Sequence, residues 1–319
     1  MAAISQSACG KAILLGEHAV VHGQPAIAIP LSNQRVTVRV EPQIIAPTGK
    51  IRVISPGLNL DDDLANMPGD HPVYQAVKLT LAELGIIQTP SCTLHITSTL
   101  PFSSGLGSSA ALAIATTRAL SGFLGHPLDR ETINRIAFEC ETHVHGKPSG
   151  IDNTVVTYEK AILFQKGQSI KFLQPGGKFR FVLADSGVRK STKETVAQLA
   201  KELSENPGKI QPELEKIGQL VLEGKQALLD GNVENLAQAI NGNQAVLKRL
   251  GLSCPEVDNL VDIALGAGAL AAKLTGGGKG GHILALVDEK SLQNVLTALK
   301  EASGEKAFFT ILEPAELSE

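Results

Sequence analysis

Hydrophobic and polar positions alternate over much of the first 100 residues, a pattern that predicts β-strands. The alternation is cleanest at residues 35–40, where Val36, Val38 and Val40 are separated by polar side chains. Shorter runs of the same character predict strands at residues 26–29, 51–54 and 93–97. We therefore expect a β-sheet in the N-terminal part of the chain.

A period of three to four residues replaces this alternation at residues 73–84, 108–122 and 130–144, and it predicts three helices. In the third helix one face is apolar, and Asp129 is placed to cap the start. That face consists of Ile133, Ile136, Ala137, Cys140 and Val144. Strands and helices are thus expected in the same part of the chain.

A second region opens with a hydrophobic strand pattern at residues 181–187. From Thr192 to about Gly266 the chain is predicted to be mostly helical. A strand at residues 282–287, a helix at 289–301 and a short strand near Ala307 follow. We predict two domains, residues 1–180 and residues 181–319.

The composition and charge of this 319-residue chain exclude some classes of binding partner. The formal net charge is −3, aromatic residues make up 3%, and tryptophan is absent. No run of four Lys or Arg residues occurs. We therefore expect no nucleic acid and no membrane as a partner.

The cysteines and the start of the chain predict the compartment. Cys9, Cys92, Cys140 and Cys254 are far apart and form no C-x-x-C pair, which is typical of thiols in a reducing compartment. The N-terminus lacks the basic region of a signal peptide, and no apolar stretch reaches the roughly 20 residues that cross a bilayer. We expect a cytoplasmic protein.

Residues 101–111 (PFSSGLGSSAA) have the composition of a phosphate-binding loop between a strand and a helix. Glycines at 105 and 107 allow backbone angles that other residues avoid, and a helix N-terminus at 108–109 presents N–H donors to a phosphate. The residues that we assign to this phosphate cradle are Pro101, Ser104, Gly105, Leu106, Gly107, Ser108, Ser109, Ala110 and Ala111. A plain glycine-serine turn with a helix cap is the simpler alternative.

The cradle also satisfies the dinucleotide pattern G-x-G-x-x-G/A from Gly105 to Ala110. A dinucleotide-binding unit needs a second strand that ends in an acidic residue about 20 residues later. Residues 121–129 hold that place, and their two glycines and one proline do not fit a buried strand. The Walker A pattern is absent as well. An NAD-dependent dehydrogenase is therefore the weaker interpretation.

Residues 10–30 form a second candidate segment. A short apolar run has Lys11 at one end and Gly16, Glu17 and His18 at the other. Such side chains together can orient a polar substrate. A surface hairpin with ordinary charges is the alternative.

Residues 139–153 (ECETHVHGKPSGIDN) form a third. The helix is predicted to end at Gly146, so that Asp152 follows a turn and lies on a loop or at a strand start, where it can face a site. Glu141 lies near the helix end, where a solvated face is the usual place for glutamate. The pairs Glu139/His143 and Glu141/His145 are spaced for a metal, but a zinc site lacks a third ligand here.

Residues 273–286 (KLTGGGKGGHILAL) form a fourth, in which Gly276, Gly278 and Gly281 repeat G-x-G-x-x-G. We expect this loop to follow a helix and precede a strand, the wrong order for a dinucleotide turn. Its five glycines indicate a backbone that lies close to the substrate or to the first loop.

These segments, in this order over residues 10–286, resemble the GHMP kinase family, named for galactokinase, homoserine kinase, mevalonate kinase and phosphomevalonate kinase. SSGLGSSAA is similar to the ATP-phosphate motif of that family. GEHAVVHG-x-PAIA, KPSGIDN, KLTGGGKGG and ADSGVRKST look most like its mevalonate-phosphorylating branch. The resemblance implies an enzyme that uses ATP to convert mevalonate into mevalonate 5-phosphate in isoprenoid precursor synthesis.

The resemblance also implies roles for the matching residues. Asp152 would be the catalytic carboxylate that faces the hydroxyl, with Lys11 beside it to stabilise the developing alkoxide. Ser109 and Glu141 would help to hold Mg²⁺ on the phosphates of ATP. Glu17 and His18 would line the mevalonate pocket. The third-motif loop would comprise Thr275, Gly276, Gly277 and Gly278.

The implied fold is α+β, with an N-terminal α+β domain that contains a left-handed β-α-β crossover and a C-terminal ferredoxin-like α+β domain. A homodimer is a reasonable default. The chain departs from the family pattern at Lys279, at His282 and at residues 102–104, which include Ser103. An extra lysine beside the phosphates could change nucleotide affinity. Other acceptors (phosphomevalonate or the 3-hydroxyl of mevalonate) and a non-catalytic ligand sensor are the alternatives.

Overall fold

The protein is described by a computed structural model that covers residues 2–43, 49–102, 104–145 and 148–314. Ser103, Gly146 and Lys147 therefore lie outside the described residues. The chain divides into two compact units. Unit 1 comprises Met1–Lys11 and Gln34–Glu159, and unit 2 comprises Ala12–Asn33 and Lys160–Glu319. The domain boundary at residue 180 stays a prediction.

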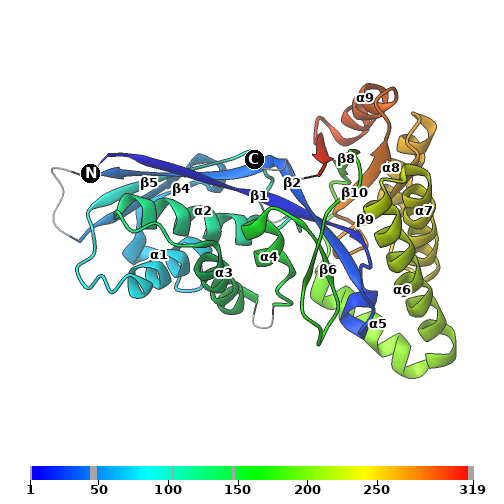
Figure 1. Cartoon of the computed structure of the whole chain (residues 1–319), viewed down its shortest axis with the longest axis horizontal. Helices are drawn as coiled ribbons and strands as arrows, with labels where there is room; N and C mark the ends of the chain where they lie inside the picture. Colours follow the sequence, from blue (N-terminus) through cyan, green and yellow to red (C-terminus); the bar gives the residue numbers. More distant parts are fainter. Residues whose placement is uncertain (1, 44–48, 103, 146–147, 315–319) are drawn as a thin grey trace. The chain divides into compact units, whose positions relative to one another are not determined.

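Two long strands belong to both units. Strand β1 spans Ile4–Leu15 and strand β2 spans Ala26–Pro42, so each passes from one unit into the other (Figure 1). The sequence indicated only short runs here, because the polar residues in the middle of β2 interrupt its hydrophobic pattern. The two strands pair with each other.

The sheet of unit 1 has the strand order β4-β3-β5-β2. The bounds are Leu60–Asp63 for β4, Ile51–Ser55 for β3 and Cys92–Ser98 for β5. Strand β3 runs parallel to β5, whereas β2 runs antiparallel to it, with Val38 opposite Ile96. The predicted alternation is confirmed, because Val36, Val38 and Val40 are fully buried.

The helices of unit 1 lie on one face of this sheet (Figure 1). They are α1 (Pro72–Glu83), α2 (Ser108–Phe123), α3 (Arg130–His145) and α4 (Ile151–Tyr158). Helix α2 packs against the other three, and its side chains from Ala110 to Ala115 are buried all round. Short 3-10 helices occur at Pro56–Leu58 and Leu64–Asn66. Helix α2 is thus a rigid support for the loop that precedes it.

Helix α4 corrects a prediction. We expected Asp152 on a loop or at a strand start, but it lies in the first turn of α4, which begins after Gly150 in a left-handed conformation (φ 88°). The β-branched residues of this helix favour strands by propensity. Packing decides otherwise, because Val155 and Val156 are fully buried where α4 meets α2 and α3.

Unit 2 has an antiparallel sheet with the order β11-β8-β10-β9. The bounds are Phe179–Asp185 for β8, Ala271–Thr275 for β9, His282–Val287 for β10 and Ala307–Leu312 for β11. The element sequence β-α-β-β-α-β with this order is ferredoxin-like. The expected α+β architecture is confirmed. The loop at Gly276 follows strand β9 rather than the helix that we expected.

Two further strands of unit 2, β6 (Ala161–Phe164) and β7 (Lys171–Leu173), extend the start of β2, with Ala26 opposite Phe164. The helices are α5 (Thr192–Glu205), α6 (Pro207–Asp230), α7 (Val233–Arg249), α8 (Pro255–Gly266) and α9 (Leu292–Ser303). Helix α8 packs on β9 and β10, and α9 packs on β8 and β11. The 3-10 helix Ala19–His22 contacts α6.

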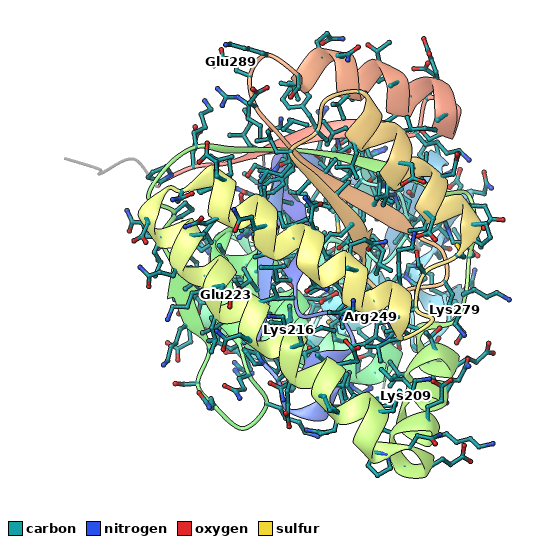
Figure 2. The ribbon with its side chains drawn as sticks, turned by 90° about the vertical axis from the view of Figure 1, so that its right-hand side faces the viewer. Lys209, Lys216, Glu223, Arg249, Lys279 and Glu289 are labelled. Carbon is teal, nitrogen blue, oxygen red and sulfur yellow. The ribbon has the colours of Figure 1, made fainter. Side chains whose placement is uncertain are left out.

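The outer face of α6 and α7 carries exposed charges of both signs (Figure 2). Lys209, Lys216 and Glu223 lie along α6, and Arg249 at the end of α7 pairs with Glu213 at 2.7 Å. Mixed charge of this kind is typical of a solvated helix face. No helix in the described part of the chain is long and apolar enough to cross a membrane. All four cysteines are free thiols, three of them buried, as expected.

Candidate active site

The phosphate cradle lies where β5 leads into α2, as predicted. Gly107 is the N-cap of α2 with φ 76°, and the described residues provide no side-chain cap there. The first helical hydrogen bond runs from the Ala111 N–H to the Gly107 carbonyl at 2.9 Å. The N–H groups of Ser109 and Ala110 therefore have no partner within the helix, which makes this end suitable for an anion.

Gly107 is required by its neighbour as well as by its backbone angle. A Cβ atom at this position would lie 2.8 Å from Cγ of Lys11. The Lys11 N–H donates to the Leu106 carbonyl at 2.8 Å, so β1 is fastened to the loop. The φ of Gly105 is also 76°, but no described atom lies within 4 Å of a Cβ built there. The two glycines thus differ in what a side chain would meet.

Lys11 and Asp152 form an ion pair in unit 1. The Lys11 Nζ lies 3.2 Å from the Asp152 Oδ1, and the two side chains are 9% and 33% exposed. Strand β1 places the lysine, and the first turn of α4 places the aspartate. A mostly buried ammonium group thus stands beside a carboxylate that solvent and ligands can reach.

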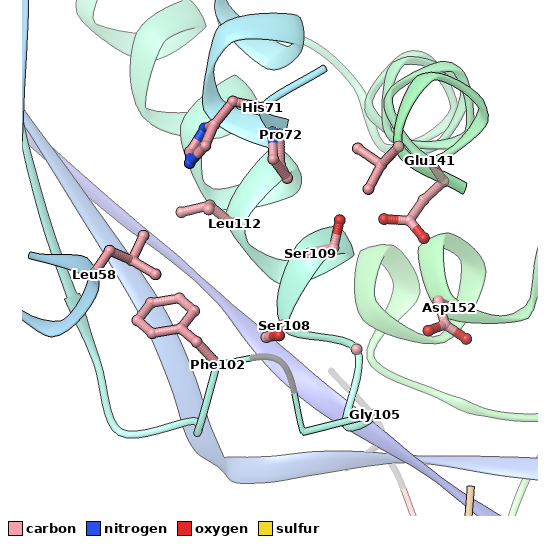
Figure 3. A pocket seen from close by; sticks show the side chains of 12 residues that line it. Leu58, His71, Pro72, Phe102, Gly105, Ser108, Ser109, Leu112, Glu141 and Asp152 are labelled. Carbon is pink, nitrogen blue, oxygen red and sulfur yellow. The ribbon is translucent and has the colours of Figure 1, made fainter. Parts of the chain in front are cut away.

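A cavity of about 470 Å³ is lined by Asp152 of this pair and by the cradle. Ser109 on α2, Glu141 on α3 and Asp152 on α4 are directed at it from separate helices (Figure 3). The cradle residues that line it are Gly105, Gly107, Ser108 and Ser109. Ala110, Ala111 and Leu106 are buried beneath, and they support the loop rather than face the cavity.

The opposite wall of the cavity is apolar and was missed by sequence reasoning. Leu58, Pro72, Phe102 and Leu112 form it (Figure 3). His71 joins them at the start of α1, where its Nδ1 accepts from the Val73 N–H at 3.2 Å. Burial lowers the pKa of His71, and the nearby Asp70 charge opposes this shift. The neutral ring therefore carries its proton on Nε2. Only the His71-Pro72 pair, a cap followed by a first-turn proline, signals a helix start in the sequence.

Ser109 and Glu141 fit a hard metal ion. The Ser109 hydroxyl is buried and has no hydrogen-bond partner among the described residues. Glu141 is 5% exposed as a residue and lines the same cavity. Oxygen ligands of this kind suit Mg²⁺, which keeps several of its waters and binds few protein groups. Within the described residues, no three His, Cys, Asp or Glu side chains gather for a metal.

In unit 2, Glu17 is fully buried and paired with Lys273 of β9. Burial lowers the pKa of Lys273, while the charge and the hydrogen bond of Glu17 act in the opposite direction. The Gly16 N–H donates to Asn243 Oδ1 at 3.1 Å, so the turn is also held by α7. Lys273 was not singled out in the sequence, since a lysine in a five-residue strand gives no signal of its partner.

Thr275 holds the same two segments together. Its hydroxyl donates to the Ile13 carbonyl at 2.9 Å and accepts from the Ile13 N–H at 3.1 Å. Both contacts lie within unit 2. The turn after β1 and the third-motif loop are therefore attached to the same strand, β9.

His18 is buried beside the third-motif loop. It is 5% exposed and adopts φ 61°, an angle that is uncommon outside glycine. A Cβ at Gly278 would lie 3.0 Å from the His18 Nε2. Burial lowers the pKa of His18 to about 4, so the ring is neutral at pH 7. The loop and the ring thus pack in direct contact.

The third-motif loop is packed against its own unit. A Cβ at Gly277 would meet the Thr192 hydroxyl at 2.1 Å, and one at Gly278 would meet the Leu252 carbonyl at 2.7 Å. Lys279, which we considered as a group beside the phosphates, donates from Nζ to Gln198 of α5 at 2.6 Å. Figure 2 shows Lys279 within unit 2. This contact gives the lysine a structural role.

The segment at residues 184–192 flanks this loop. Burial alone would raise the pKa of Asp185, but hydrogen bonds from Arg189 and from the Gly187 N–H outweigh it and lower the pKa to about 2. Arg189 contacts both carboxylate oxygens, at 2.7 and 2.6 Å. His282, the other departure from the family pattern, is buried on β10 opposite Asp185.

Comparisons with known proteins agree on one group of enzymes. Family models match at residues 71–160, described as GHMP kinases N terminal domain, and at residues 225–305, described as GHMP kinases C terminal. The chain is 35% identical to the mevalonate kinase of Thermococcus gammatolerans over 322 residues, with 93% of each chain covered.

Solved structures are similar over the whole length. The mevalonate kinase of L. major in complex with R-mevalonate superposes with a TM-score of 0.83 at 28% identity, covering 98% of this chain and 96% of that one. The mevalonate kinase of Methanococcus jannaschii gives 0.84 at 27% identity, with 99% of both chains covered. This chain and the two mevalonate kinase structures are therefore similar in amino-acid sequence as well as in fold.

Proposed function

The chain belongs to the GHMP kinase family, and we propose that it transfers the γ-phosphoryl group of ATP to the 5-hydroxyl of mevalonate. The products are mevalonate 5-phosphate and ADP, as in isoprenoid precursor synthesis by the mevalonate pathway. The observation that carries the proposal is the Lys11–Asp152 pair, whose aspartate lines the same cavity as the start of α2. The four free cysteines support a cytoplasmic location.

The cradle binds the phosphates of ATP. The N–H groups at the start of α2 point at the anion, and Gly105 and Gly107 let the backbone approach it. Because α2 is buried all round, these donors are held in place before the nucleotide arrives. Positioning and charge neutralisation are the main demands of phosphoryl transfer.

Ser109 and Glu141 would hold Mg²⁺ through the hydroxyl and the carboxylate. The orphaned Ser109 hydroxyl and the buried Glu141 carboxylate support this assignment. The ion would supply positive charge that neutralises the phosphates of ATP. These two residues come from different helices, so the packing of α2 against α3 sets their separation.

Asp152 accepts or orients the proton of the attacking hydroxyl, and Lys11 stabilises the alkoxide as it develops. The lysine is nine-tenths buried, so its charge is poorly screened and acts strongly on a neighbouring oxygen. The aspartate is one-third exposed and can meet a substrate.

The apolar wall of the cavity takes the nucleoside. Leu58, Phe102 and Leu112 offer a surface for a planar base, and the Nε2 proton of His71 offers one donor to a ring acceptor. ATP therefore lies with its base toward α1 and its phosphates toward α2 and α4, all within unit 1.

The acceptor residues proposed in unit 2 are Glu17 and His18, which follow Lys11 along the chain. Glu17 is tied to Lys273, so it orients the turn and the backbone around His18. A neutral His18 can donate one hydrogen bond and accept another, which suits a hydroxyl or a carboxylate. Residues 275–278 keep this turn in place through Ile13 and His18.

An ADP-release assay across mevalonate, phosphomevalonate, homoserine and galactose tests the function. We expect release with mevalonate alone, and phosphorus NMR should show the phosphate on the 5-oxygen. A product phosphorylated on the 3-oxygen, or a preference for phosphomevalonate, would refute the proposed acceptor. ATP binding without ADP release from any alcohol would indicate a ligand sensor, and NAD binding without ATP-dependent chemistry would indicate a dehydrogenase. A homodimer stays a separate proposal, which light scattering tests.

A further inference from the structure

A second cavity of unit 1 is separate from the proposed ATP site. Its volume is about 510 Å³, within the range of small-molecule sites. It shares no lining residue with the first cavity. Helices α2, α3 and α4 contribute to both cavities, together with other segments of unit 1.

The second cavity is positively charged. Arg35, Arg118 and Arg130 line it, and Glu159 is the one acidic side chain among its described lining residues. Three cations against one anion leave two positive charges. Arginine forks match the geometry of phosphate oxygens, and two positive charges match a phosphate dianion.

Glu159 organises two of the arginines. Arg35 holds both carboxylate oxygens, at 2.9 and 2.8 Å, and Arg118 reaches one of them at 3.2 Å. Arg118 also donates to the carbonyls of Ser7 and Thr157, at 2.7 and 2.8 Å. A purely structural ion pair needs one cation for one anion, so the second and third arginines exceed that need.

Two lining groups lack partners among the described residues. Arg130 is exposed at the first position of α3 and forms no ion pair with any described residue. The Thr157 hydroxyl is buried, with the residue 1% exposed, and no described residue hydrogen-bonds to it. Buried hydroxyls are normally satisfied, so this one indicates a place for a polar ligand atom.

The cavity walls are the far ends of the elements that carry the proposed catalytic groups. Helix α2 has Ser109 at one end and Arg118 toward the other, about 14 Å away at 1.5 Å per residue. Helix α3 has Glu141 and Arg130, about 17 Å apart on the same basis. Helix α4 begins with Asp152 and reaches the cavity at Thr157. Strand β1 carries Ser7 to the cavity and Lys11 to the active site.

We infer that this cavity is a second ligand site, for a small phosphate or diphosphate ester, and that its occupation alters nucleotide binding at the first cavity. A ligand that pulls on Arg118, Arg130 and Thr157 acts on the same three helices that position Ser109, Glu141 and Asp152. Rigid helices transmit a shift from one end to the other, and coupling between two sites is reciprocal.

Titration calorimetry with inorganic pyrophosphate tests the site on the intact chain without nucleotide. Pyrophosphate also suits the cradle, so two classes of site are expected. Arg130→Ala should weaken one class about tenfold or more, because a charge-assisted bond to phosphate is lost, and Arg130→Glu should abolish it. The matched control is Arg135→Ala, an exposed arginine on the same helix that contacts Glu83 and Glu139 and should leave both classes unchanged. Thermal melting checks that each variant is folded.

The coupling is tested with saturating ADP, which occupies the first cavity. The affinity of the Arg130-dependent class should change, and the affinity for ADP should change by the same factor when that class is filled. Equal pyrophosphate binding in wild type, Arg130→Ala and Arg135→Ala, or no binding beyond the cradle, would overturn the site. An Arg130-dependent class that ADP leaves unaltered would overturn the coupling. If ADP itself does not bind, the proposed kinase function fails, and the calorimetry without nucleotide still decides the site.

Discussion

The two glycine loops share one sequence pattern and differ in their surroundings. The loop with Gly105 and Gly107 lies in unit 1 and opens on a cavity. The loop from Gly276 to Gly281 lies in unit 2, where Thr192, Leu252 and Val188 pack against it. The same spacing of glycines thus presents a ligand site in one unit and a packed connection in the other.

The difference arises from what each loop precedes. The first loop enters helix α2, whose first N–H groups have no partner within the helix. The second loop joins β9 to β10, and antiparallel pairing holds the strand ends, with His282 opposite Thr275. The first turn of a helix leaves backbone N–H donors that can bind an anion, whereas paired strands use their N–H groups in hydrogen bonds to each other. Glycine spacing alone does not distinguish the two cases.

Removal of the charged group beside the first loop should have the largest effect. Asp152→Asn should lower turnover by about 10²–10⁴ with little change in nucleotide affinity, because the amide cannot take the hydroxyl proton. Lys279→Met is the matched change at the second loop, and it should alter turnover by about twofold or less, since the Lys279 ammonium group donates to Gln198 of α5. Steady-state assays with ATP-analogue binding compare the two. Near-normal turnover in Asp152→Asn would remove the assigned role.

The histidine packed on the second loop should make stability depend on pH. The pKa of His18 is about 4 in the folded protein against 6.5 for an ordinary histidine, so the unfolded chain takes up the proton first. Stability is therefore full above 6.5 and falls as the pH drops from 6.5 toward 4, by up to about 3 kcal/mol.

Urea unfolding at about pH 7 and about pH 4.5 measures this loss. His18→Gln should reduce the difference between the two pH values. His126→Gln, at an exposed histidine of unit 1, should leave it intact. Equal pH dependence in wild type and His18→Gln would show that His18 is not responsible.

Alanine at one glycine of each loop sharpens the comparison. Gly107→Ala and Gly278→Ala should each destabilise the fold by about 1–3 kcal/mol, because both positions have positive φ and a close neighbour. Only Gly107→Ala should also weaken ATP-analogue binding severalfold, because its Cβ displaces Lys11. Gly105→Ala and Gly276→Ala, which have positive φ but open space among the described residues, isolate the backbone strain. A matching loss of nucleotide affinity in Gly278→Ala would contradict the contrast.

The smallest expected effect concerns the apolar wall near the first loop. His71→Ala should weaken ATP binding about two- to tenfold, through loss of one hydrogen bond to the base. His71→Asn keeps an oxygen that can cap α1, so it should keep stability while losing the same affinity. Fluorescence titration with an ATP analogue measures the affinity of each variant, and unfolding curves measure its stability. Unchanged affinity in both variants would place the base elsewhere.

Local patterns in the sequence predicted much of the fold. The valines of β2 alternate because one face of the sheet is buried, and the apolar face of α3 repeats every three to four residues for the same reason. The cradle was predictable because a strand, two glycines and a helix start follow one another directly. The resemblance to a known family supplied the roles of Lys11, Asp152 and Glu141. Without it, residues of these types could equally have been ordinary surface charges.

Other features depend on contacts between distant residues. Helix α4 is stabilised by burial against α2 and α3, against the strand propensity of its own residues. The partner of Glu17 is Lys273, and the apolar wall combines Leu58, His71 and Leu112 from separate segments. No window of sequence contains such pairs.

The cradle of residues 101–111 and the loop of residues 273–286 summarise this division. The sequence alone determined that both would be tight, glycine-lined turns, because backbone freedom is a property of each residue. Tertiary structure decided that the first of them opens on the cavity of about 470 Å³, because the walls around the start of α2 and the packing around Gly278 depend on what the rest of the chain places beside them.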